Sequence, residues 1–304
     1  MDLSIVIVSW NTQKLLEECL TSIYAYPPEG EYEIWVVDNA STDRTSDSIQ
    51  LNFPLVRLVV NKSNIGFATA NNRAISQCSG RYILVLNPDT LVKPGSLPTL
   101  IRYLDEHPQS GAVGPRVLNP DGTLQMSCYP APTLARQLWK LLHLDSLRAY
   151  GEYDQGRWDP DRDRPVDVIQ GACLLLRKKA LDQIGLFDED YFMYTEEVDL
   201  CYRLRKAGWK LYWEPHAEII HYGGQSTQQV APDMFIQLYQ SKILYFRKNH
   251  GRLSSLIYKL ILLAISLVRV SLTPFAWLER SSQREQHLKL GANYLHLIRV
   301  LPGS

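Results

Sequence analysis

The chain has 304 residues, of which 45% are hydrophobic and 21% are charged. Both shares are ordinary for a globular protein with a sizeable core, which excludes disordered, collagen-like and coiled-coil proteins. The formal net charge of zero hides an uneven distribution. Residues 1–246 carry 23 Lys and Arg against 30 Asp and Glu, whereas residues 247–304 carry nine against two. We therefore expect an acidic body and a basic tail with different partners.

Three further features narrow the class of protein. The basic residues of the body are scattered, which predicts no nucleic-acid partner. The five cysteines are odd in number, far apart and without a C-x-x-C motif, which indicates a reducing compartment rather than a disulfide framework or a zinc site. The segment Met1–Ile5 lacks the basic region of a signal peptide, so we expect a cytoplasmic protein.

Four short apolar runs in the first half predict strands of a parallel sheet, because continuous rather than alternating apolarity is typical of strands buried on both faces. The runs are 3–8, 34–37, 56–60 and 82–86. Helices are predicted between them at 13–24, 43–51 and 68–78, the second with Ser41 as its N-cap. This alternation is typical of a doubly wound α/β fold, in which ligands bind beyond the carboxyl ends of the strands.

Polar segments follow all four predicted strands, at 9–11, 38–39, 61–66 and 87–90. Asp38 ends a buried strand, where a carboxylate either contacts the base or ribose of a nucleotide or caps the next turn. Asn87 and Asp89 can supply an amide oxygen and a carboxylate to a divalent cation that holds a diphosphate, or they form an Asx-Pro turn. His221, beside a two-glycine turn, is either a structural residue or a ligand of the metal or diphosphate.

The pattern changes after about residue 115, where we expect an acceptor-facing half. The segment 119–122 predicts a hairpin turn, 150–166 a charged loop, 168–176 another buried strand and 196–207 a helix. Glu196, Glu197 and Asp199 lie at the start of that helix, where acids also complement the helix dipole. Glu196 and Asp199 share a face from which Glu197 diverges, so one acid can serve as a general base while others make structural contacts, such as Asp199 with Arg203.

The tail predicts a long amphipathic helix. Its polar positions between 248 and 273 form one narrow stripe, made of Lys248, Arg252, Ser255, Lys259, Ser266, Arg269 and Thr273. The longest uncharged runs, 260–268 and 270–278, are shorter than the roughly 20 residues that span a bilayer. We expect a helix that lies on an anionic membrane with Phe275 and Trp277 as anchors, or one that packs on the body or on a second subunit of a homodimer.

Eight elements along the chain occur together in one known family. They are Ser4–Asn11, Val37–Ser41, Asn64–Ala68, Leu86–Thr90, Gly171–Cys173, Gly185–Glu189, Glu196–Cys201 and His221. With these motifs in this order, residues 3–250 resemble the inverting family 2 glycosyltransferases of the GT-A fold, and most closely their rhamnosyltransferase-like branch. The resemblance implies a Rossmann-like mixed, mostly parallel sheet flanked by helices over 1–250, with a nucleotide-sugar half at 1–115 and an acceptor-side half at 116–250. An amphipathic helical extension follows over 251–304.

The resemblance also implies roles for individual residues. Asp38 matches the base-binding aspartate, Asp89 the last residue of the D-x-D metal motif, and His221 a histidine that helps to hold the metal. Glu197 matches the second acid of the catalytic pair, with Glu196 and Asp199 in support. The expected nucleotide-sugar site consists of Ser9, Asn11, Asp38, Ser41, Asn64, Gly66 and Asn87. Two positions depart from the family pattern, because Asn87 replaces the first Asp of D-x-D and Glu197 replaces an Asp.

The expected reaction is inverting transfer of a sugar from a nucleoside diphosphate to a glycan or a lipid-linked acceptor in polysaccharide biosynthesis. Such a transfer needs one base, and a divalent metal, Mn²⁺ or Mg²⁺, that stabilises the leaving diphosphate. A glycoside hydrolase would instead need two carboxyls that flank the bond. L-Rhamnose from dTDP-rhamnose is the first candidate donor, and a UDP-hexose or UDP-N-acetylhexosamine is the second. The alternative from another class is a catalytically silent sugar-nucleotide-binding scaffold. For the enzyme as for the scaffold, the expected location is the cytoplasm or the inner face of the cell membrane.

Overall fold

A computed structural model describes residues 1–225, 227–278 and 281–303. The chain forms two compact units. Unit 1 comprises residues 1–131, 152–192 and 196–229, and unit 2 comprises residues 132–151, 193–195 and 230–304. All residues that the sequence analysis assigns to the nucleotide, the metal and the catalytic base belong to unit 1.

Unit 1 is built on one mixed sheet with the strand order β3-β2-β1-β4-β11-β6-β12-β5. These strands are β1 Leu3–Ser9, β2 Tyr32–Asp38, β3 Arg57–Val60, β4 Tyr82–Leu86, β5 Thr90–Val92, β6 Ser110–Leu118, β11 Cys173–Arg177 and β12 Lys210–His221. Strands β1 to β4 run parallel, as do β6 and β12, whereas β11 and β5 are antiparallel to their neighbours. The predicted mixed, mostly parallel sheet is confirmed.

Short strands extend this sheet at its periphery. Strand β7 (Leu124–Gln125) pairs with β6 through the predicted 119–122 hairpin, and β9 (Arg164–Pro165) pairs with β12. A separate two-stranded sheet joins β8 (Cys128–Tyr129) to β10 (Val168–Ile169).

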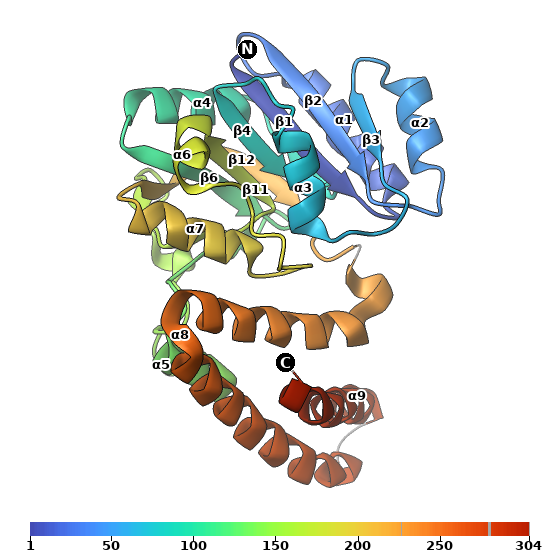
Figure 1. The fold of residues 1–304 in the computed structure, drawn as a ribbon, viewed down its shortest axis with the longest axis vertical. Helices are drawn as coiled ribbons and strands as arrows, with labels where there is room; N and C mark the ends of the chain where they lie inside the picture. The colour runs from blue at the N-terminus through green and yellow to red at the C-terminus, as the bar shows by residue number, and fades with distance from the viewer. Residues whose placement is uncertain (226, 279–280, 304) are drawn as a thin grey trace. The chain divides into compact units, whose positions relative to one another are not determined.

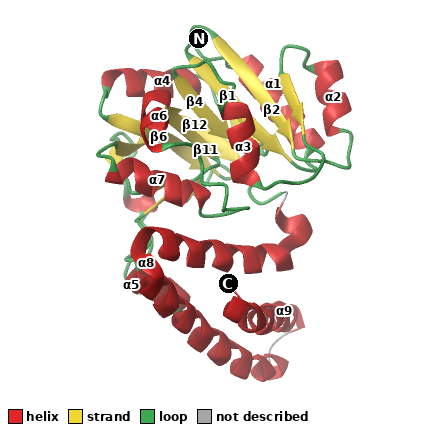
Figure 2. Ribbon diagram, viewed as in Figure 1, coloured by secondary structure: helices red, strands yellow, loops and turns green. Residues whose placement is uncertain are grey.

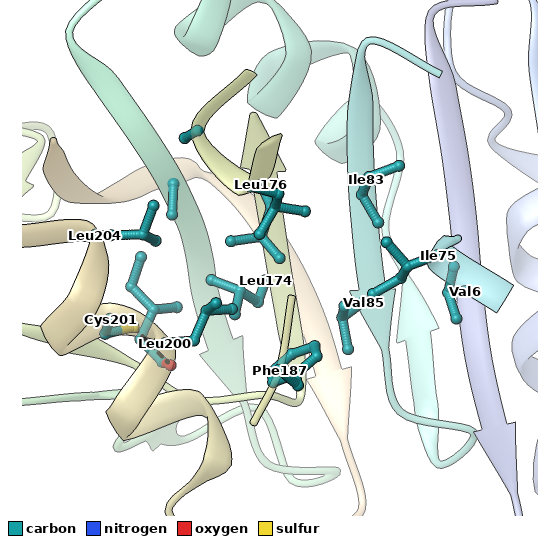
Figure 3. Close-up of a cluster of buried hydrophobic side chains, with 14 of the residues drawn as sticks. Val6, Ile75, Ile83, Val85, Leu174, Leu176, Phe187, Leu200, Cys201 and Leu204 are labelled. Atoms are coloured by element: carbon teal, nitrogen blue, oxygen red, sulfur yellow. Dashed lines mark hydrogen bonds between the residues drawn. The ribbon is translucent and has the colours of Figure 1, made fainter. Parts of the chain in front are cut away.

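Helices cover the sheet of unit 1 (Figures 1 and 2). The alternation of side chains along the strands builds a core on each face of the sheet. The helices are α1 Gln13–Ala25, α2 Thr45–Asn52, α3 Phe67–Ile75, α4 Ser96–Glu106, α6 Lys178–Ile184 and α7 Glu196–Lys206, with 3-10 turns η2 Gln155–Arg157 and η3 Thr227–Val230. Val6 belongs to the core with Leu174 and Leu200 (Figure 3), whereas its neighbours Ile5 and Ile7 belong to the core on the opposite face. Burial on both faces explains the continuous apolar runs of β1, β2 and β4. The same prediction for 56–60 is wrong, because β3 is the edge strand of the sheet and its Val60 is exposed.

The structure corrects two local predictions. The predicted strand 168–176 is two strands in different sheets, β10 and β11, because the chain crosses between the sheets at Gly171. Ser41 is not the N-cap of α2, which begins after Arg44. Asp43 instead accepts the backbone N–H of Thr45 at 3.1 Å.

Unit 2 is helical. It contains α5 Leu134–Leu141, η1 Leu144–Ser146, α8 Ala231–Leu272, η4 Thr273–Leu278, α9 Ser281–Val300 and η5 Leu301–Gly303. Helix α8 bends at Gly251, whose φ of 87° and ψ of 168° interrupt the helix and divide it into a first arm, 231–250, and a second arm, 252–272 (Figure 1). The rings of Phe246 and Tyr258, one from each arm, lie 4.8 Å apart.

Part of the polar stripe of the tail, Ser255, Ser266, Arg269 and Thr273, contacts other residues of unit 2, whereas Lys248 and Arg252 of the same stripe are exposed. Ser255 and Ser266 are buried, and Ser255 donates its hydroxyl to the carbonyl of Ile243 in the first arm at 3.2 Å. Thr273 packs against α9 so closely that a Cβ on Gly291 would lie 2.3 Å from its Oγ1. These residues lie on the packed side of the second arm together with the buried Tyr258 and Leu262, and the leucines on the opposite side are exposed.

Candidate active site

The carboxyl ends of β1 and β2 lie side by side in the sheet. Ser9 is paired in register with Asp38, and the N–H of Asn39 donates to the carbonyl of Ser9 at 2.8 Å. Asp38 is buried, and it accepts the N–H of Ser41 at 2.8 Å and the hydroxyl of Ser46. The carboxylate thus fixes the loop after β2 at the edge where ligands of such sheets bind.

Asn11 and Ser41 connect the loops that follow β1 and β2. The N–H of Asn11 donates to Ser41 Oγ at 3.0 Å, and Asn11 Oδ1 accepts the N–H of Thr42 at 2.7 Å. Asn11 has a left-handed backbone with φ of 53°, a conformation that asparagine tolerates better than most residues. Ser9 is different, because its hydroxyl is buried and bonded to Thr12 Oγ1 at 2.9 Å. The contacts of Ser9 are structural.

Asn39 is a residue that the sequence analysis missed. Its Nδ2 donates to Asn64 Oδ1 at 2.8 Å, and its Oδ1 accepts from Asn61 Nδ2 at 3.0 Å and from the N–H of Ile65 at 3.1 Å. One amide side chain therefore orders the loop that carries Asn64 and Gly66. The available signal was its position directly after Asp38.

Gly66 allows two segments of unit 1 to approach each other closely. Its φ is 82°, and a Cβ there would lie 2.4 Å from the carbonyl oxygen of Phe192. The same carbonyl accepts the N–H of Phe67 at 2.7 Å. A side chain at position 66 would separate the loop before α3 from the segment that leads towards the acid cluster.

Asp89, His221 and Asn87 meet at the opposite end of the same sheet edge. His221 is paired in register with Thr90, which places His221 Nε2 3.3 Å from Asp89 Oδ1 and 3.4 Å from Asn87 Nδ2. Both Asp89 and His221 are buried. The structure thus brings together residues that are 132 positions apart and that the sequence analysis assigned to one metal site.

Gln125 fixes which nitrogen of His221 carries the proton. Its Nε2 donates to the backbone carbonyl of His221 at 3.1 Å and to Asn119 Oδ1 at 2.8 Å, so its Oε1 is the atom that faces His221 Nδ1 at 2.6 Å. Because that oxygen can only accept, Nδ1 must donate, and in the neutral ring the lone pair belongs to Nε2. The lone pair therefore faces Asp89 and Asn87.

This arrangement fits a divalent cation. A carboxylate oxygen and an imidazole lone pair already face each other, and Mn²⁺ or Mg²⁺ bound to a nucleotide commonly takes only one or two protein ligands, with phosphate oxygens and water completing the shell. A histidine ligand whose other ring nitrogen donates to a fixed acceptor is typical of metal sites. Within 1–225, 227–278 and 281–303, no three His, Cys, Asp or Glu side chains form a cluster that could hold a metal by themselves.

The acid cluster at the start of α7 separates into acids with different environments. Asp199 is buried and forms an ion pair with Arg203, with 2.7 Å between Oδ2 and Nε, as the sequence predicted. Glu196 is also buried, and its Oε2 has no hydrogen-bond partner among the residues that the structure describes. Burial, followed by the adjacent charge of Glu197, raises the pKa of Glu196 well above its usual value. Glu197 itself is only half-buried.

Glu197 lies beside the residues of the sheet edge. Its Cβ would be 4.0 Å from a Cβ built on Gly171, and the carbonyl of the following Ala172 accepts the N–H of Asn87 at 3.0 Å. The backbone directly before α7 is left-handed at Tyr194 and Thr195, with φ of 65° and 72°. Such strain at non-glycine residues is typical of functional sites. Glu197 is the least buried of the three acids, although its Oε2 atom is itself buried.

Polar residues gather along the carboxyl edge of the mixed sheet, where ligands of such folds bind. Residues 4–185 match the family described as Glycosyl transferase family 2, and the chain belongs to this family. It is therefore a glycosyltransferase that acts in glycan biosynthesis, and the predicted family and enzyme class are confirmed.

Two curated relatives are similar over most of the chain. One is the N-acetylglucosaminyl-diphospho-decaprenol L-rhamnosyltransferase of Mycobacterium tuberculosis, which is 33% identical over 270 residues that cover 82% of this chain and 85% of the relative. The other is rhamnosyltransferase WbbL of Escherichia coli, which is 26% identical over 272 residues that cover 84% of this chain and 98% of the relative.

Solved structures share the fold. The mannosyltransferase PcManGT from Pyrobaculum calidifontis, solved with GDP-Man and Mn²⁺, matches 98% of this chain and 86% of its own with a TM-score of 0.59 at 17% identity. Residues 1–349 of TarS from S. aureus match 99% of this chain and 90% of their own with a TM-score of 0.53 at 16% identity. The predicted GT-A fold is confirmed.

Proposed function

We propose that this chain transfers L-rhamnose, with inversion at the anomeric carbon, from dTDP-rhamnose to a saccharide on a lipid diphosphate. The observation that carries the choice of sugar is the 33% identity over 270 residues to a relative that is named as an L-rhamnosyltransferase acting on N-acetylglucosaminyl-diphospho-decaprenol. The second relative, WbbL, is also named a rhamnosyltransferase.

Glu197 is the general base of the proposed reaction. Its carboxylate takes the proton of the acceptor hydroxyl while that oxygen forms a bond to the anomeric carbon. The bond between the anomeric carbon and the diphosphate oxygen breaks on the opposite face, and the nucleoside diphosphate leaves with the electron pair. One base is sufficient for this inverting displacement. The difference in burial among the three acids supports the choice of Glu197, since Glu196 and Asp199 are buried.

Asp89 and His221 would hold a divalent cation, and Asn87 borders them. When bound, the cation neutralises negative charge on the departing diphosphate. The 3.3 Å distance between Asp89 Oδ1 and His221 Nε2 and the proton on His221 Nδ1 support this assignment.

The nucleotide site of the proposal follows the ends of β1, β2 and β3. Asp38 contacts the base or ribose, and the ordered loops of Asn11, Ser41, Asn64 and Gly66 surround the nucleotide. The hydrogen bonds within these loops support a preformed binding edge, because little rearrangement is then needed when the donor binds. Ser9 acts through the loop rather than on the ligand, since its hydroxyl is buried against Thr12.

The donor is tested by thermal unfolding with dTDP, UDP, GDP and CMP, each with and without Mn²⁺. A nucleotide at 100 times its Kd should stabilise the protein by about 2.7 kcal/mol. We expect dTDP with Mn²⁺ to give the largest shift and dTDP-rhamnose to be consumed with a synthetic N-acetylglucosaminyl diphosphate lipid. Nuclear magnetic resonance of the product should report an inverted anomeric configuration. A larger shift and faster turnover with UDP-hexose or UDP-N-acetylhexosamine would reject rhamnose, and a retained configuration would reject the single-base mechanism.

A further inference from the structure

Helix α8 of unit 2 presents an apolar surface that no described residue of unit 2 buries. Its second arm exposes Leu253, Leu256, Leu260 and Leu267, whose spacing of three, four and seven residues places them on one side of the helix, and the exposed Leu272 and Phe275 follow at its end and in η4. We call these residues the outer face; their exposed fractions lie between 53% and 70%. The side chain of Trp277, which the sequence analysis named as an anchor, lies outside the described residues.

The orientation of the second arm follows from the packing of its polar side. Ser255 and Ser266 are buried, and Thr273 contacts Gly291 of α9. This side of the second arm, which also carries the buried Tyr258 and Leu262, packs inside unit 2, so the leucines on the opposite side of the helix are exposed. An exposed apolar stripe of this length on a folded unit marks a surface that binds something.

We propose that the outer face docks in the plane of an anionic membrane, with its leucines and Phe275 at the boundary between headgroups and acyl chains. The inference goes beyond the proposed transfer reaction and does not depend on it. Two observations favour a lipid surface over a second copy of the chain. Residues 247–304 carry nine Lys and Arg against two Asp and Glu. Two copies facing each other through this segment would repel, whereas anionic headgroups attract it.

The exposed Arg247 and Arg252 stand on either side of the bend at Gly251, next to the start of the outer face. Basic side chains at the edge of an apolar helix face are typical of helices that lie in the membrane interface. They would meet the headgroups while the outer face meets the acyl chains.

The packing of the second arm against α9 argues against a helix that crosses the bilayer. Residues 228–276 include an 18-residue window with a mean hydropathy of 1.9, which by length and composition alone could span a membrane. The second arm, however, packs its polar side against α9, and α9 carries the exposed ion pair of Lys289 and Glu285. A spanning arrangement would bury these charges in hydrocarbon, whereas an in-plane arrangement leaves them in water.

The test is co-sedimentation of the full chain with vesicles of phosphatidylcholine alone and of phosphatidylcholine with about one third phosphatidylglycerol. We expect binding to the anionic vesicles and weak binding to the neutral ones. The double variant Leu256→Glu, Leu260→Glu should lower the partition coefficient at least about tenfold, because two leucines leave the lipid. Arg247→Gln with Arg252→Gln should lower it about tenfold at 0.1 M salt and by much less at about 1 M salt, where charges are screened.

The matched control is Leu51→Glu with Leu55→Glu, since both leucines are 81% exposed and lie in unit 1. This control should bind vesicles like the unchanged protein. If circular dichroism shows that the outer-face variant does not fold, the milder pair Leu253→Gln, Leu260→Gln replaces it. The proposal is overturned if the full chain does not bind anionic vesicles, or if the outer-face variants bind them as well as the unchanged protein does. A dimer in analytical ultracentrifugation that the outer-face variant dissociates, without any vesicle binding, would assign the face to a second copy.

Discussion

Gln125 Oε1 accepts a hydrogen bond from His221 Nδ1 at 2.6 Å, and the backbone carbonyl of His221 accepts from the same glutamine amide. This pair of bonds determines both the orientation of the imidazole and the position of its proton. We therefore expect Gln125 to be a positioning residue of the metal site.

Gln125→Met removes the acceptor at nearly unchanged volume, so the affinity for Mn²⁺ in the presence of a nucleoside diphosphate should fall by about 10- to 100-fold. The free Mn²⁺ signal in electron paramagnetic resonance measures this directly. Gln125→Glu is the variant to compare with it, because the glutamate keeps an acceptor for His221 Nδ1 but removes the donor to Asn119. If Gln125→Glu lowers the affinity for Mn²⁺ as much as Gln125→Met does, Gln125 only stabilises the local fold, and its role in positioning His221 is wrong.

Gly66 and Gly185 form a matched pair for testing the contact with Phe192. Their backbones are nearly identical, with φ and ψ of 82° and 170° at Gly66 and of 83° and 170° at Gly185. A Cβ would meet the Phe192 carbonyl at 2.4 Å in the first case and nothing within 4 Å in the second. Gly66→Ala should therefore lower the free energy of unfolding by about 1–3 kcal/mol more than Gly185→Ala. Denaturant titration measures the difference, and equal losses would show that the segments adjust without strain.

In this protein the same feature of the sequence, an apolar run that changes to polar residues, predicts both the strands and the site residues. A strand buried on both faces needs continuous apolarity, and its carboxyl end must then change to polar residues where the chain leaves the sheet. Asp38 and Asp89 could be located from that change alone. The split between β10 and β11 also had a signal in the sequence, because Gln170 and Gly171 interrupt the apolar run, but a two-residue interruption does not show that the two strands belong to different sheets.

Contacts between distant segments explain the residues that the sequence analysis missed. Gln125 acquires its role from a hydrogen bond to a histidine 96 positions away, and no local pattern encodes that register. The stripe in α8 was visible in the sequence, but its direction was not. The burial of Ser255 and Ser266 and the packing of Thr273 against Gly291 show which side of the helix faces inward.

Glu196 should make the stability of the protein depend on pH. Its pKa is raised above 4.5 by burial and by the neighbouring Glu197 charge, so the folded state keeps a proton that the unfolded state loses as the pH rises past 4.5. The free energy of unfolding therefore falls with increasing pH from about that value up to the raised pKa, with a slope of at most about 1.4 kcal/mol per pH unit. Glu196→Gln resembles the protonated acid and should remove this slope, so that the variant becomes more stable than the unchanged protein at neutral pH.

Denaturant unfolding between pH 4.5 and pH 8 measures the effect of Glu196→Gln. Glu29→Gln, at an exposed position of unit 1, serves as the control and should leave the pH dependence unchanged. A destabilised Glu196→Gln at neutral pH would mean that Glu196 is ionised in the folded protein.

Glu197→Gln tests the general base. The substitution keeps the size of the side chain and most of its hydrogen bonds but cannot take a proton, so kcat should fall by about 10²- to 10⁴-fold while the Kd for the donor stays within about threefold. Glu197→Asp retains a carboxylate and should keep measurable activity. Glu196→Gln should leave most of kcat, because that acid is buried and its pKa is raised by burial. The assignment of the base would be reversed if Glu196→Gln were inactive and Glu197→Gln turned over normally, and turnover in both variants would require a base outside α7.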